Sequence, residues 1–334
     1  MSGNFVWRDA GRTVVFGAGG VGSAPKLLAE YGMEPFALLS TPRHLGDAEG
    51  LAGEAVAVHE VPSGGVPEAA AELLDAASAE NLVALGGGRA IDTAKAIAAV
   101  TGARVAAIPT TMSGAEMTGI HRLPAGAEDR ASALVRPSLV LADPEAMTSA
   151  PEPELRASSM NALAHGADSL YTPFANPVSE MTALRGAQLI ATSLDEGAAE
   201  RSRDALALGS ILCGYAIDSG MFSLHHVICQ TLVRICGTPH AGTNAAILPR
   251  AMAFMAPRAP DGLVPLATAL STEPGAIEAR ILELGGNPPG LGDQGADQSK
   301  LPEALESMSL RPELAFTPEP PTGDELRELI EKAW

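Results

Sequence analysis

The chain has 334 residues, which is enough for two domains that each bury a hydrophobic core. Hydrophobic residues make up 46% and charged residues 19%, as is typical of a globular protein, and no apolar run is long enough to span a bilayer. The net charge of −18 and the aromatic content of 4% argue against nucleic acid and anionic membranes as partners.

The cysteines and the first residues bear on localisation. The 3 cysteines (Cys213, Cys229 and Cys236) are an odd number, stand in apolar segments and lack C-x-x-C spacing. This pattern is typical of reduced, buried thiols. The first twelve residues contain no uninterrupted apolar stretch, so we expect no secretion signal. We therefore predict a cytoplasmic protein.

The first half of the chain alternates short apolar runs with helical stretches. We predict strands at 13–16, 35–40, 55–61, 81–85, 103–109 and 138–142. Strands separated in this way indicate a parallel, doubly wound sheet. Residues 1–150 are therefore predicted to form an α/β, Rossmann-like domain, and we expect this domain to bind NAD(P).

Two glycine clusters follow predicted strands. The first spells G-x-G-x-x-G with Gly17, Gly19 and Gly22, between a strand and a predicted helix that ends at Gly32. A dinucleotide fingerprint also expects an acidic residue after the second strand, but Ser40 and Thr41 stand there. Without that acidic partner the first cluster is a weak signal for a cofactor.

The second glycine cluster also opens a predicted helix. Glycines at such a turn allow a pyrophosphate to reach the backbone N–H groups of the helix N-terminus. A tight turn without a ligand is the alternative for either cluster, and we favour phosphate binding for the second. Its candidate cofactor-binding residues are Gly86, Gly87, Gly88, Arg89, Asp92 and Lys95.

Further cofactor candidates follow two other predicted strands. Thr110, Thr111 and Ser113 offer hydroxyl groups to a ribose or a phosphate. Arg43 follows the second strand beside Ser40 and Thr41, where the adenosine ribose of a cofactor often lies. It is either a partner for a 2′-phosphate or an ordinary surface charge. The sequence does not choose between NADH and NADPH.

The pattern changes at 143–154, which is polar and rich in proline. Helices are predicted at 154–171, 179–194, 208–217 and 223–236, and in the last segment, where Thr322 and Glu325 suggest a capping box. The last helix carries an apolar stripe typical of core packing, made by Leu326, Leu329, Ile330 and Ala333. The stretch 288–322 is predicted to be mostly loop with one short helix. Residues 151–334 are thus predicted to form an all-helical domain that carries the substrate or metal site.

Histidines are concentrated in this second half. Four of the 7 histidines lie between 165 and 240, and His165 and His226 fall on predicted helices, while His240 follows a Gly-Thr-Pro break. Asn161 and Asp168 share a helix face with His165. Converging imidazoles hold a divalent metal or polarise a substrate carbonyl. The alternative is that each is an ordinary core or surface residue.

Several segments in this order resemble a known family. G-G-G-R-A-I-D-T-A-K-A, P-T-T-M-S-G-A-E-M-T, D-P-E, M-N-A-L-A-H-G-A-D-S-L-Y and L-H-H-…-G-T-P-H-A are similar to the iron-containing (group III) alcohol dehydrogenase superfamily, from near residue 13 to the C-terminus. L-L-S-T-P, M-N-A-x-A-H and F-A-N-P resemble its maleylacetate reductase branch.

The resemblance implies a dehydroquinate synthase-like fold, with a Rossmann-like domain followed by an all-α domain. It also implies a homodimer that uses NADH or NADPH to reduce the carbon–carbon double bond of maleylacetate to 3-oxoadipate, in the degradation of aromatic compounds. Hydride reaches one alkene carbon, the carbonyl takes up charge as an enolate, and a proton follows. His165, His225, His226 and His240 are the implied catalytic residues.

The resemblance also bears on a metal. Metal-dependent members use one Asp and three His, which match Asn161, His165, His226 and His240 here. Asparagine is a neutral and poorer ligand than aspartate, which weakens the prediction of bound iron or zinc. Without metal, His225, His226 and His240 would serve as hydrogen-bond donors or cations toward an acidic substrate.

Other departures from the family pattern affect the substrate. Gln230 replaces a histidine, Val227 stands where a lysine would help to hold a carboxylate, Arg89 replaces a serine, and Glu319 replaces an arginine. The physiological substrate is therefore maleylacetate or another unsaturated or keto acid. The remaining alternatives are a metal-dependent alcohol or aldehyde dehydrogenase, a non-redox lyase or cyclase, and a cofactor-binding protein on the same fold.

Overall fold

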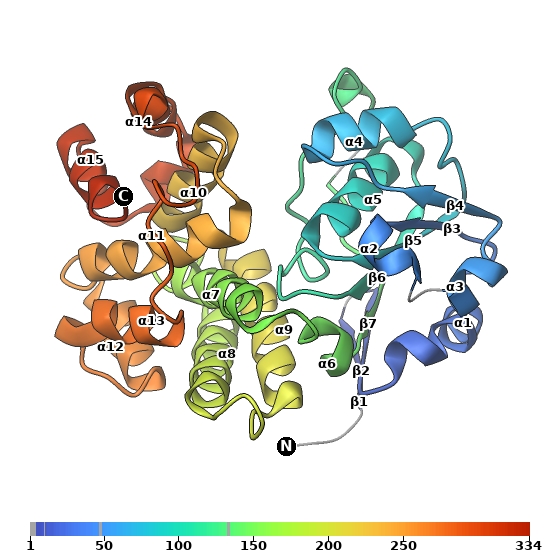
Figure 1. The fold of residues 1–334 in the computed structure, drawn as a ribbon, viewed down its shortest axis with the longest axis horizontal. Helices are drawn as coiled ribbons and strands as arrows, with labels where there is room; N and C mark the ends of the chain where they lie inside the picture. The colour runs from blue at the N-terminus through green and yellow to red at the C-terminus, as the bar shows by residue number, and fades with distance from the viewer. Residues whose placement is uncertain (1–4, 10, 47–48, 132–133) are drawn as a thin grey trace. The chain divides into compact units, whose positions relative to one another are not determined.

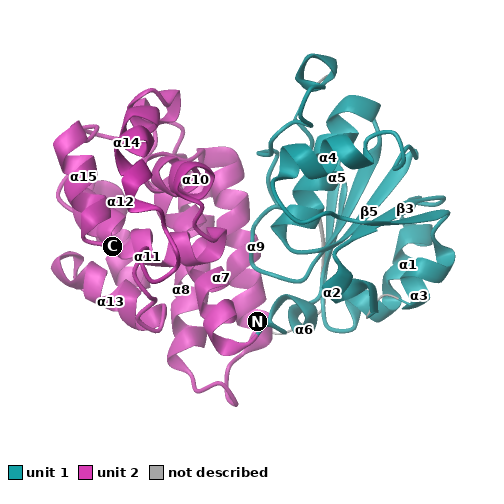
Figure 2. Cartoon of the chain, turned by 45° about the horizontal axis from the view of Figure 1, so that its top comes forward, with its two compact units in different colours: residues 1–150 teal, residues 151–334 magenta. Residues whose placement is uncertain are grey.

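The computed structural model describes residues 5–9, 11–46, 49–131 and 134–334. The chain divides into two compact units, 1–150 and 151–334, and each is described by itself (Figure 2). Of the first twelve residues, on which the expected lack of a secretion signal rests, 1–4 and 10 lie outside the described part.

Unit 1 is built on a seven-stranded sheet with the order β1-β2-β7-β6-β5-β3-β4 (Figure 1). The strands are β1 (Phe5–Asp9), β2 (Arg12–Phe16), β3 (Ala37–Ser40), β4 (Ala57–Glu60), β5 (Asn81–Gly86), β6 (Arg104–Pro109) and β7 (Leu139–Ala142). All neighbours run parallel except β1, which pairs antiparallel with β2. The predicted parallel sheet is confirmed. The additional strand β1, an edge strand that ends in Arg8 and Asp9, was missed because it lacks a β-branched run.

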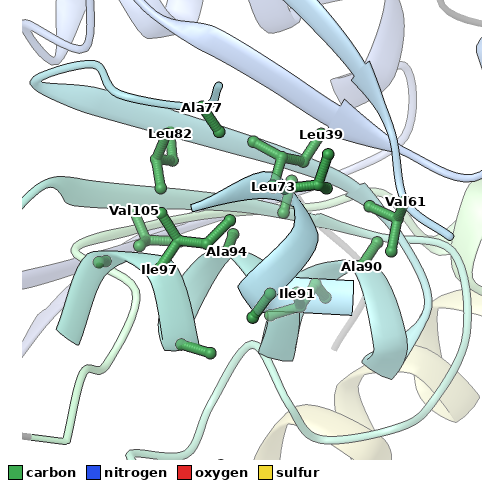
Figure 3. Packing of buried hydrophobic residues seen from close by; sticks show 14 of the residues in the cluster. Leu39, Val61, Leu73, Ala77, Leu82, Ala90, Ile91, Ala94, Ile97 and Val105 are labelled. Carbon is green, nitrogen blue, oxygen red and sulfur yellow. The ribbon is translucent and has the colours of Figure 1, made fainter. Parts of the chain in front are cut away.

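Helices pack on both faces of this sheet because both faces of the inner strands are apolar. They are α1 (Gly20–Glu30), α2 (Pro42–Leu45), α3 (Glu49–Glu54), α4 (Val66–Leu73), α5 (Gly88–Thr101) and α6 (Pro144–Met147), with the 3₁₀ turn η2 (Glu128–Arg130). On one face, α4 and α5 pack against Leu39, Leu82 and Val105 (Figure 3). On the other face, α1 and α3 pack against the alternate residues Leu38 and Val83.

The strand order places a ligand site in unit 1. From β3 the chain moves to β4 on one side, whereas β5, β6 and β7 follow on the other side. The order therefore reverses between β3 and β5. In open α/β sheets, ligands bind at the carboxyl ends of the strands at such a reversal. The segments that begin at the carboxyl ends of β3, β5 and β6 carry the cofactor candidates, which are Ser40, Thr41 and Arg43, then Gly86, Gly87, Gly88, Arg89, Asp92 and Lys95, and then Thr110, Thr111 and Ser113.

The regular secondary structure of unit 2, within its described residues, consists of helices. Its helices are α7 (Glu152–Ser169), α8 (Pro177–Asp195), α9 (Arg203–Gly220), α10 (Leu224–Cys236), α11 (His240–Met255), α12 (Pro260–Ala269), α13 (Ile277–Leu284), α14 (Leu301–Ser309) and α15 (Gly323–Glu331), with the 3₁₀ turns η3 (Pro274–Ala276), η4 (Gln298–Lys300) and η5 (Pro312–Phe316). Helix α7 packs against α8, α9, α10 and α11. Helices α8 and α9 approach closely, since a Cβ atom on Gly186 would lie 2.8 Å from the carbonyl oxygen of Gly209.

Local predictions for unit 2 agree with the structure. Thr322 and Glu325 form the predicted capping box at the start of α15, and the predicted apolar stripe from Leu326 to Ala333 is buried. The stretch 288–322 is mostly irregular around α14, η4 and η5. Among the described residues, no single helix is long and apolar enough to cross a membrane. Helices α9 and α10 pass that test only as a pair, by length and composition, and they are bent by 99°.

Candidate functional site

In unit 1, the loops after β3, β5 and β6 are tied together by hydrogen bonds. The backbone N–H of Thr110 donates to the carbonyl of Gly86 at 3.1 Å. The hydroxyl of Thr110 lies 3.1 Å from Nε2 of His44, which belongs to α2. Thr110 thus connects the glycine turn after β5 with the turn after β3, and the candidate residues of three segments are brought together at the reversal point of the sheet.

The glycine turn is in close contact with the loop after β6. A Cβ atom on Gly87 would lie 3.0 Å from Oγ1 of Thr111, and one on Gly88 would lie 3.1 Å from Cβ of Ser113. Side chains at these two positions would fill the space between the N-terminus of α5 and the hydroxyl groups that face it. The turn therefore fits a pyrophosphate that approaches the backbone, as the sequence predicts for a dinucleotide.

The remaining cofactor candidates differ in how exposed their side chains are. Ser40 is fully buried, and its hydroxyl donates to the carbonyl of Leu85 at 2.8 Å, so it serves the sheet. Thr41 is the N-cap residue of α2, and Arg43 is exposed on that helix. Arg89 is exposed in the first turn of α5. Only Thr41, Arg43 and Arg89 of this group have a surface that a ligand can reach.

Asp92 and Lys95 pair with each other on α5. Nζ of Lys95 lies 2.8 Å from Oδ1 of Asp92, and Lys95 is 0% exposed. A side chain without accessible surface does not contact a bound cofactor directly. Lys95 is thus engaged inside unit 1, and its part in cofactor binding is argued below.

The first glycine cluster already holds an anionic group. At the N-terminus of α1, the backbone N–H of Val21 donates to Oδ2 of Asp143 at 3.2 Å, and a Cβ atom on Gly20 would lie 3.4 Å from Cβ of Asp143. A carboxylate at a helix N-terminus occupies the position that a phosphate would take. The weaker of the two predicted glycine signals is thus explained by contact with an internal carboxylate.

In unit 2, three histidine rings lie together. The rings of His165 on α7 and His226 on α10 are stacked with centroids 5.0 Å apart and an interplanar angle of 16°. His225 and His226 are 5.0 Å apart, edge to face. Nδ1 of His165 and Nε2 of His226 are buried and have no hydrogen-bond partner among the described residues. Two ring nitrogens are therefore available to a ligand.

Asp168 fixes the N-terminus of α10 and the ring of His226. Its Oδ2 accepts from Nδ1 of His226 at 2.8 Å and from the backbone N–H of Ser223 at 2.8 Å, while Tyr171 donates its hydroxyl to Oδ1. Burial raises the pKa of Asp168, but the hydrogen bond and charge of His226, the charge of His225 and the hydrogen bond from Tyr171 together outweigh burial and bring the pKa to about 2. Asp168 is therefore an ionised, fully buried carboxylate.

His225 is engaged inside unit 2. It is 0% exposed, and its Nε2 lies 2.8 Å from Oδ1 of Asn244. The amide of Asn244 donates to the carbonyl of His240 at 2.7 Å, so its oxygen must face His225. Nε2 of His225 consequently carries the proton. This ring connects α10 to the start of α11 through Asn244.

Burial also sets the charge of the cluster. Burial lowers the pKa of His165 well below its ordinary value, and repulsion from His226 and His240 adds to this effect. Burial, assisted by repulsion from His226, lowers the pKa of His225 to about 3. Both rings are neutral near pH 7. His240 is exposed as the first residue of α11, and it lies close enough to influence His165 electrostatically.

Comparison with known proteins decides the family. The model for the C-terminal domain of the Fe-containing alcohol dehydrogenase family matches residues 156–334, and the iron-containing alcohol dehydrogenase model matches residues 11–144. The chain belongs to the iron-containing alcohol dehydrogenase family. The family consists of NAD(P)-dependent oxidoreductases, which confirms the enzyme class predicted from the sequence.

Relatives place the chain within the maleylacetate reductase branch of this family. It is 32% identical to maleylacetate reductase 1 of Rhodococcus opacus over 351 residues, which cover 100% of this chain and 97% of the relative. It is 36% identical to maleylacetate reductase 2 of Cupriavidus pinatubonensis, over 80% of this chain and 79% of the relative. The crystal structure of maleylacetate reductase from Agrobacterium tumefaciens matches with a TM-score of 0.84 and 29% identity, covering 100% and 99%.

The name of the iron-containing family raises the question of a metal. Of the four matching positions, Asn161 supplies a neutral amide where an anionic ligand is expected. Within 5–9, 11–46, 49–131 and 134–334, no group of three His, Cys, Asp or Glu side chains is arranged to hold a metal ion. Asn161 is thus a poorer ligand than the anionic residue expected there, and the chemistry proposed below uses no metal.

Departures from the family pattern lie in three kinds of environment. Gln230 is half-buried on α10, one turn after His226, and its Oε1 accepts from Arg311 at 3.0 Å. Val227 is fully buried in the core, so this position does not line a substrate pocket. Glu319 is exposed with a left-handed backbone (φ 47°). Of these three positions, only Gln230 is both partly exposed and one helical turn from His226.

Three residues of the two sites went unrecognised in the sequence. His44 follows Arg43, and its tie to Thr110 depends on the neighbouring strands. Asn244 lies one turn after His240, a spacing that signals a shared helix face. Tyr171 lies three residues after Asp168, which gives a similar signal.

Proposed function

We propose that this protein is a metal-independent, NAD(P)H-dependent reductase of maleylacetate or a closely related unsaturated keto acid. The observation that carries this proposal is the stacked pair of His165 and His226, with two unpartnered ring nitrogens and no anionic metal ligand at position 161. The kinship with maleylacetate reductases supports the substrate class. We further propose that the enzyme acts in the cytoplasm as a homodimer.

The cofactor site is proposed at the turn from Gly86 to Gly88 and at the facing residues Thr111 and Ser113. Their close contact leaves a space that only glycines keep open. Backbone N–H groups at the start of α5 would bind the pyrophosphate. Bound NAD(P)H supplies the hydride. Arg43 and Arg89, both exposed, are the cations available to phosphate groups in this part of unit 1.

His226 is proposed to handle charge and protons at the substrate. Its Nδ1–H donates to Asp168, which fixes the ring and leaves Nε2 available. The ionised Asp168 supplies the counter-charge for a protonated His226. Such an imidazolium donates a hydrogen bond to the carbonyl oxygen as it gains charge, and it can deliver the proton that completes the reduction.

His165 and His240 would assist this residue at the substrate. His165 is neutral and offers Nδ1 to the substrate, either as a donor or as an acceptor. His240 begins α11, where the positive end of the helix dipole favours an anionic group. A dianionic acid would thus meet the imidazole of His226 and the N-terminus of α11, because Asp168 already caps α10.

The test is reduction of maleylacetate by protein of known metal content. Purified protein is analysed for iron and zinc and then incubated with NADH or NADPH, with and without maleylacetate, while the nicotinamide absorbance is followed. We expect oxidation of the cofactor that requires maleylacetate in a sample without stoichiometric metal. Activity that disappears with a chelator and returns with Fe²⁺ or Zn²⁺ would contradict the metal-independent mechanism. Cofactor binding without turnover would contradict the substrate.

A further inference from the structure

Lys95 is a buried cation whose ammonium group contacts the loop after β6. It lies on α5, two turns after the glycine turn, and it is 0% exposed. Its ammonium group lies 2.8 Å from Asp92, and it donates to the carbonyl oxygens of Ala115 and Ile120 at 3.0 Å each. A longer contact of 3.5 Å joins the ammonium group to the hydroxyl of Thr118, so three of its four acceptors belong to the loop after β6.

A second buried cation holds the same loop. Arg12 on β2 is 5% exposed, and its Nη1 donates to the carbonyl of Met117 at 2.6 Å. The carbonyl groups of Ala115, Met117 and Ile120 are therefore all held by cations from other parts of the unit. A buried charge is costly, and hydrophobic replacements are often no less stable. A pair of buried cations on one irregular loop indicates a need for a defined loop conformation.

The loop that is held begins with the residues facing the glycine turn. Thr111 and Ser113 lie four and two residues before Ala115, and Ser113 would contact a Cβ atom on Gly88 at 3.1 Å. The loop is also closed on itself, because the N–H of Met117 donates to the carbonyl of Gly114 at 3.0 Å. The position of residues 115–120 therefore determines how far the hydroxyl groups of Thr111 and Ser113 lie from the start of α5.

We propose that Lys95 is a positioning residue for NAD(P)H. It does not touch the cofactor but holds the 115–120 segment so that Thr111 and Ser113 face the N-terminus of α5. Helix α5 therefore supplies both the binding turn and, two turns later, the cation that fixes the opposite wall. The identity of the ligand rests on the proposed function, whereas the holding of the loop does not.

The test compares Lys95→Met with the double variant Lys95→Met/Asp92→Asn. The single variant removes the ammonium group and leaves the Asp92 carboxylate unpaired. The double variant removes both charges, which should recover much of the lost stability. Lys26→Met is the matched control, because Lys26 is exposed on α1 in the same unit and loses the same charge. Thermal unfolding, NADH affinity by fluorescence and amide hydrogen exchange of 111–120 are measured for each variant.

We expect the Kd for NADH to rise at least about tenfold in both Lys95 variants, while kcat at saturating cofactor stays within about threefold of the parent. Hydrogen exchange of 111–120 should accelerate in both, although the double variant unfolds at a higher temperature than the single one. The Lys26 variant should behave like the parent. Lys95→Gln replaces Lys95→Met if the latter does not fold.

Two results would overturn the proposal. One is an unchanged Kd and unchanged exchange of 111–120 in the single variant. The other is a double variant that regains both stability and NADH affinity, which would assign Lys95 a purely stabilising role. Failure of the parent protein to bind NADH or NADPH would instead refute the proposed function, and the hydrogen-exchange comparison would still decide whether Lys95 holds the loop.

Discussion

The carboxylate of Asp168 accepts a 2.8 Å hydrogen bond from Nδ1 of His226, and this contact determines which nitrogen of His226 is available. The same carboxylate accepts from the backbone N–H of Ser223, so one buried charge orients the ring and caps α10. Carboxylates that hold an imidazole in this way set both its tautomer and its basicity.

Replacing Asp168 with asparagine should lower kcat for the acid substrate by roughly 10- to 100-fold, because the amide lacks the charge that supports a protonated His226. The Kd for NADH should not change. Tyr171→Phe is the matched control, since it removes one hydrogen bond from Asp168 and keeps the carboxylate. Steady-state kinetics with NADH titration check this, and equal kcat values in parent and Asp168→Asn protein would contradict it.

His226→Ala and His240→Ala should lower turnover by roughly 10²- to 10⁴-fold, the range expected when a proton-transfer group is lost. Both residues belong to unit 2, so binding of NADH to unit 1 should be spared. His225→Ala should act through stability, because His225 is fully buried against Asn244. Thermal unfolding, NADH affinity and turnover are measured for all three variants. Full activity of His226→Ala would remove this residue from the mechanism.

The two glycine clusters can be told apart by substitution. Gly87→Val should abolish NADH binding, because even its Cβ atom would lie 3.0 Å from the Thr111 hydroxyl. Gly22→Ala is the control: Gly22 belongs to the first cluster, nothing lies within 4 Å of its added Cβ atom, and its backbone is not left-handed. Fluorescence titration with NADH should show normal affinity for Gly22→Ala. Weak binding in this control would return the first cluster to the cofactor site.

Residue patterns in the sequence were sufficient to predict the sheet, the helical second half and the glycine turn at Gly87. They could not rank the two glycine clusters by contact, because the carboxylate that occupies the first comes from Asp143, more than a hundred residues later. The burial of Lys95 can also be expected from the sequence. Lys95 stands between Ala94 and Ala96 in a helix whose residues from Ile91 to Ala99 are mostly apolar, where a lysine must be buried.

The sequence also does not predict which of the two adjacent histidines, His225 or His226, faces His165. Consecutive residues on a helix point about 100° apart, so His225 and His226 cannot both face His165. The sequence does not say which of the two does. The packing of α10 against α7 and α11 decides it, since it directs His226 to His165 and His225 to Asn244. Placing Asp168 at the start of α10 likewise required the tertiary contact between α7 and α10.

Glu152 should make the stability of unit 2 fall in acid. Arg201 donates two hydrogen bonds to its carboxylate at 2.6 and 2.8 Å, and they lower the pKa of Glu152 from 4.5 to about 2. The resulting stabilisation is present above pH 4.5 and is lost as the pH falls toward 2. Its side chain is 41% exposed, so solvent screening limits the effect to about 1 kcal/mol. Urea unfolding of Glu152→Gln should show this loss at pH 7 and convergence with the parent near pH 2.

Glu116 should have the opposite pH dependence. It is fully buried beside Lys95 and Arg12, and neither carboxylate oxygen has a hydrogen-bond partner among the described residues. Burial raises the pKa of Glu116 from 4.5 to about 7. The folded state therefore holds this proton more tightly than the unfolded chain, and stability falls as the pH rises from 4.5 to 7.

Glu116→Gln should remove this cost because the amide does not ionise. The shift corresponds to a gain in the free energy of unfolding on the order of 3 kcal/mol at pH 8, and to almost none at pH 4. Denaturant unfolding of parent and variant at both pH values measures the difference. Asp92→Asn, which removes a nearby but partly exposed carboxylate, is the control for a general change in charge. A gain of the same size at both pH values would mean that Glu116 is not ionised by pH 8, and that the variant stabilises through packing.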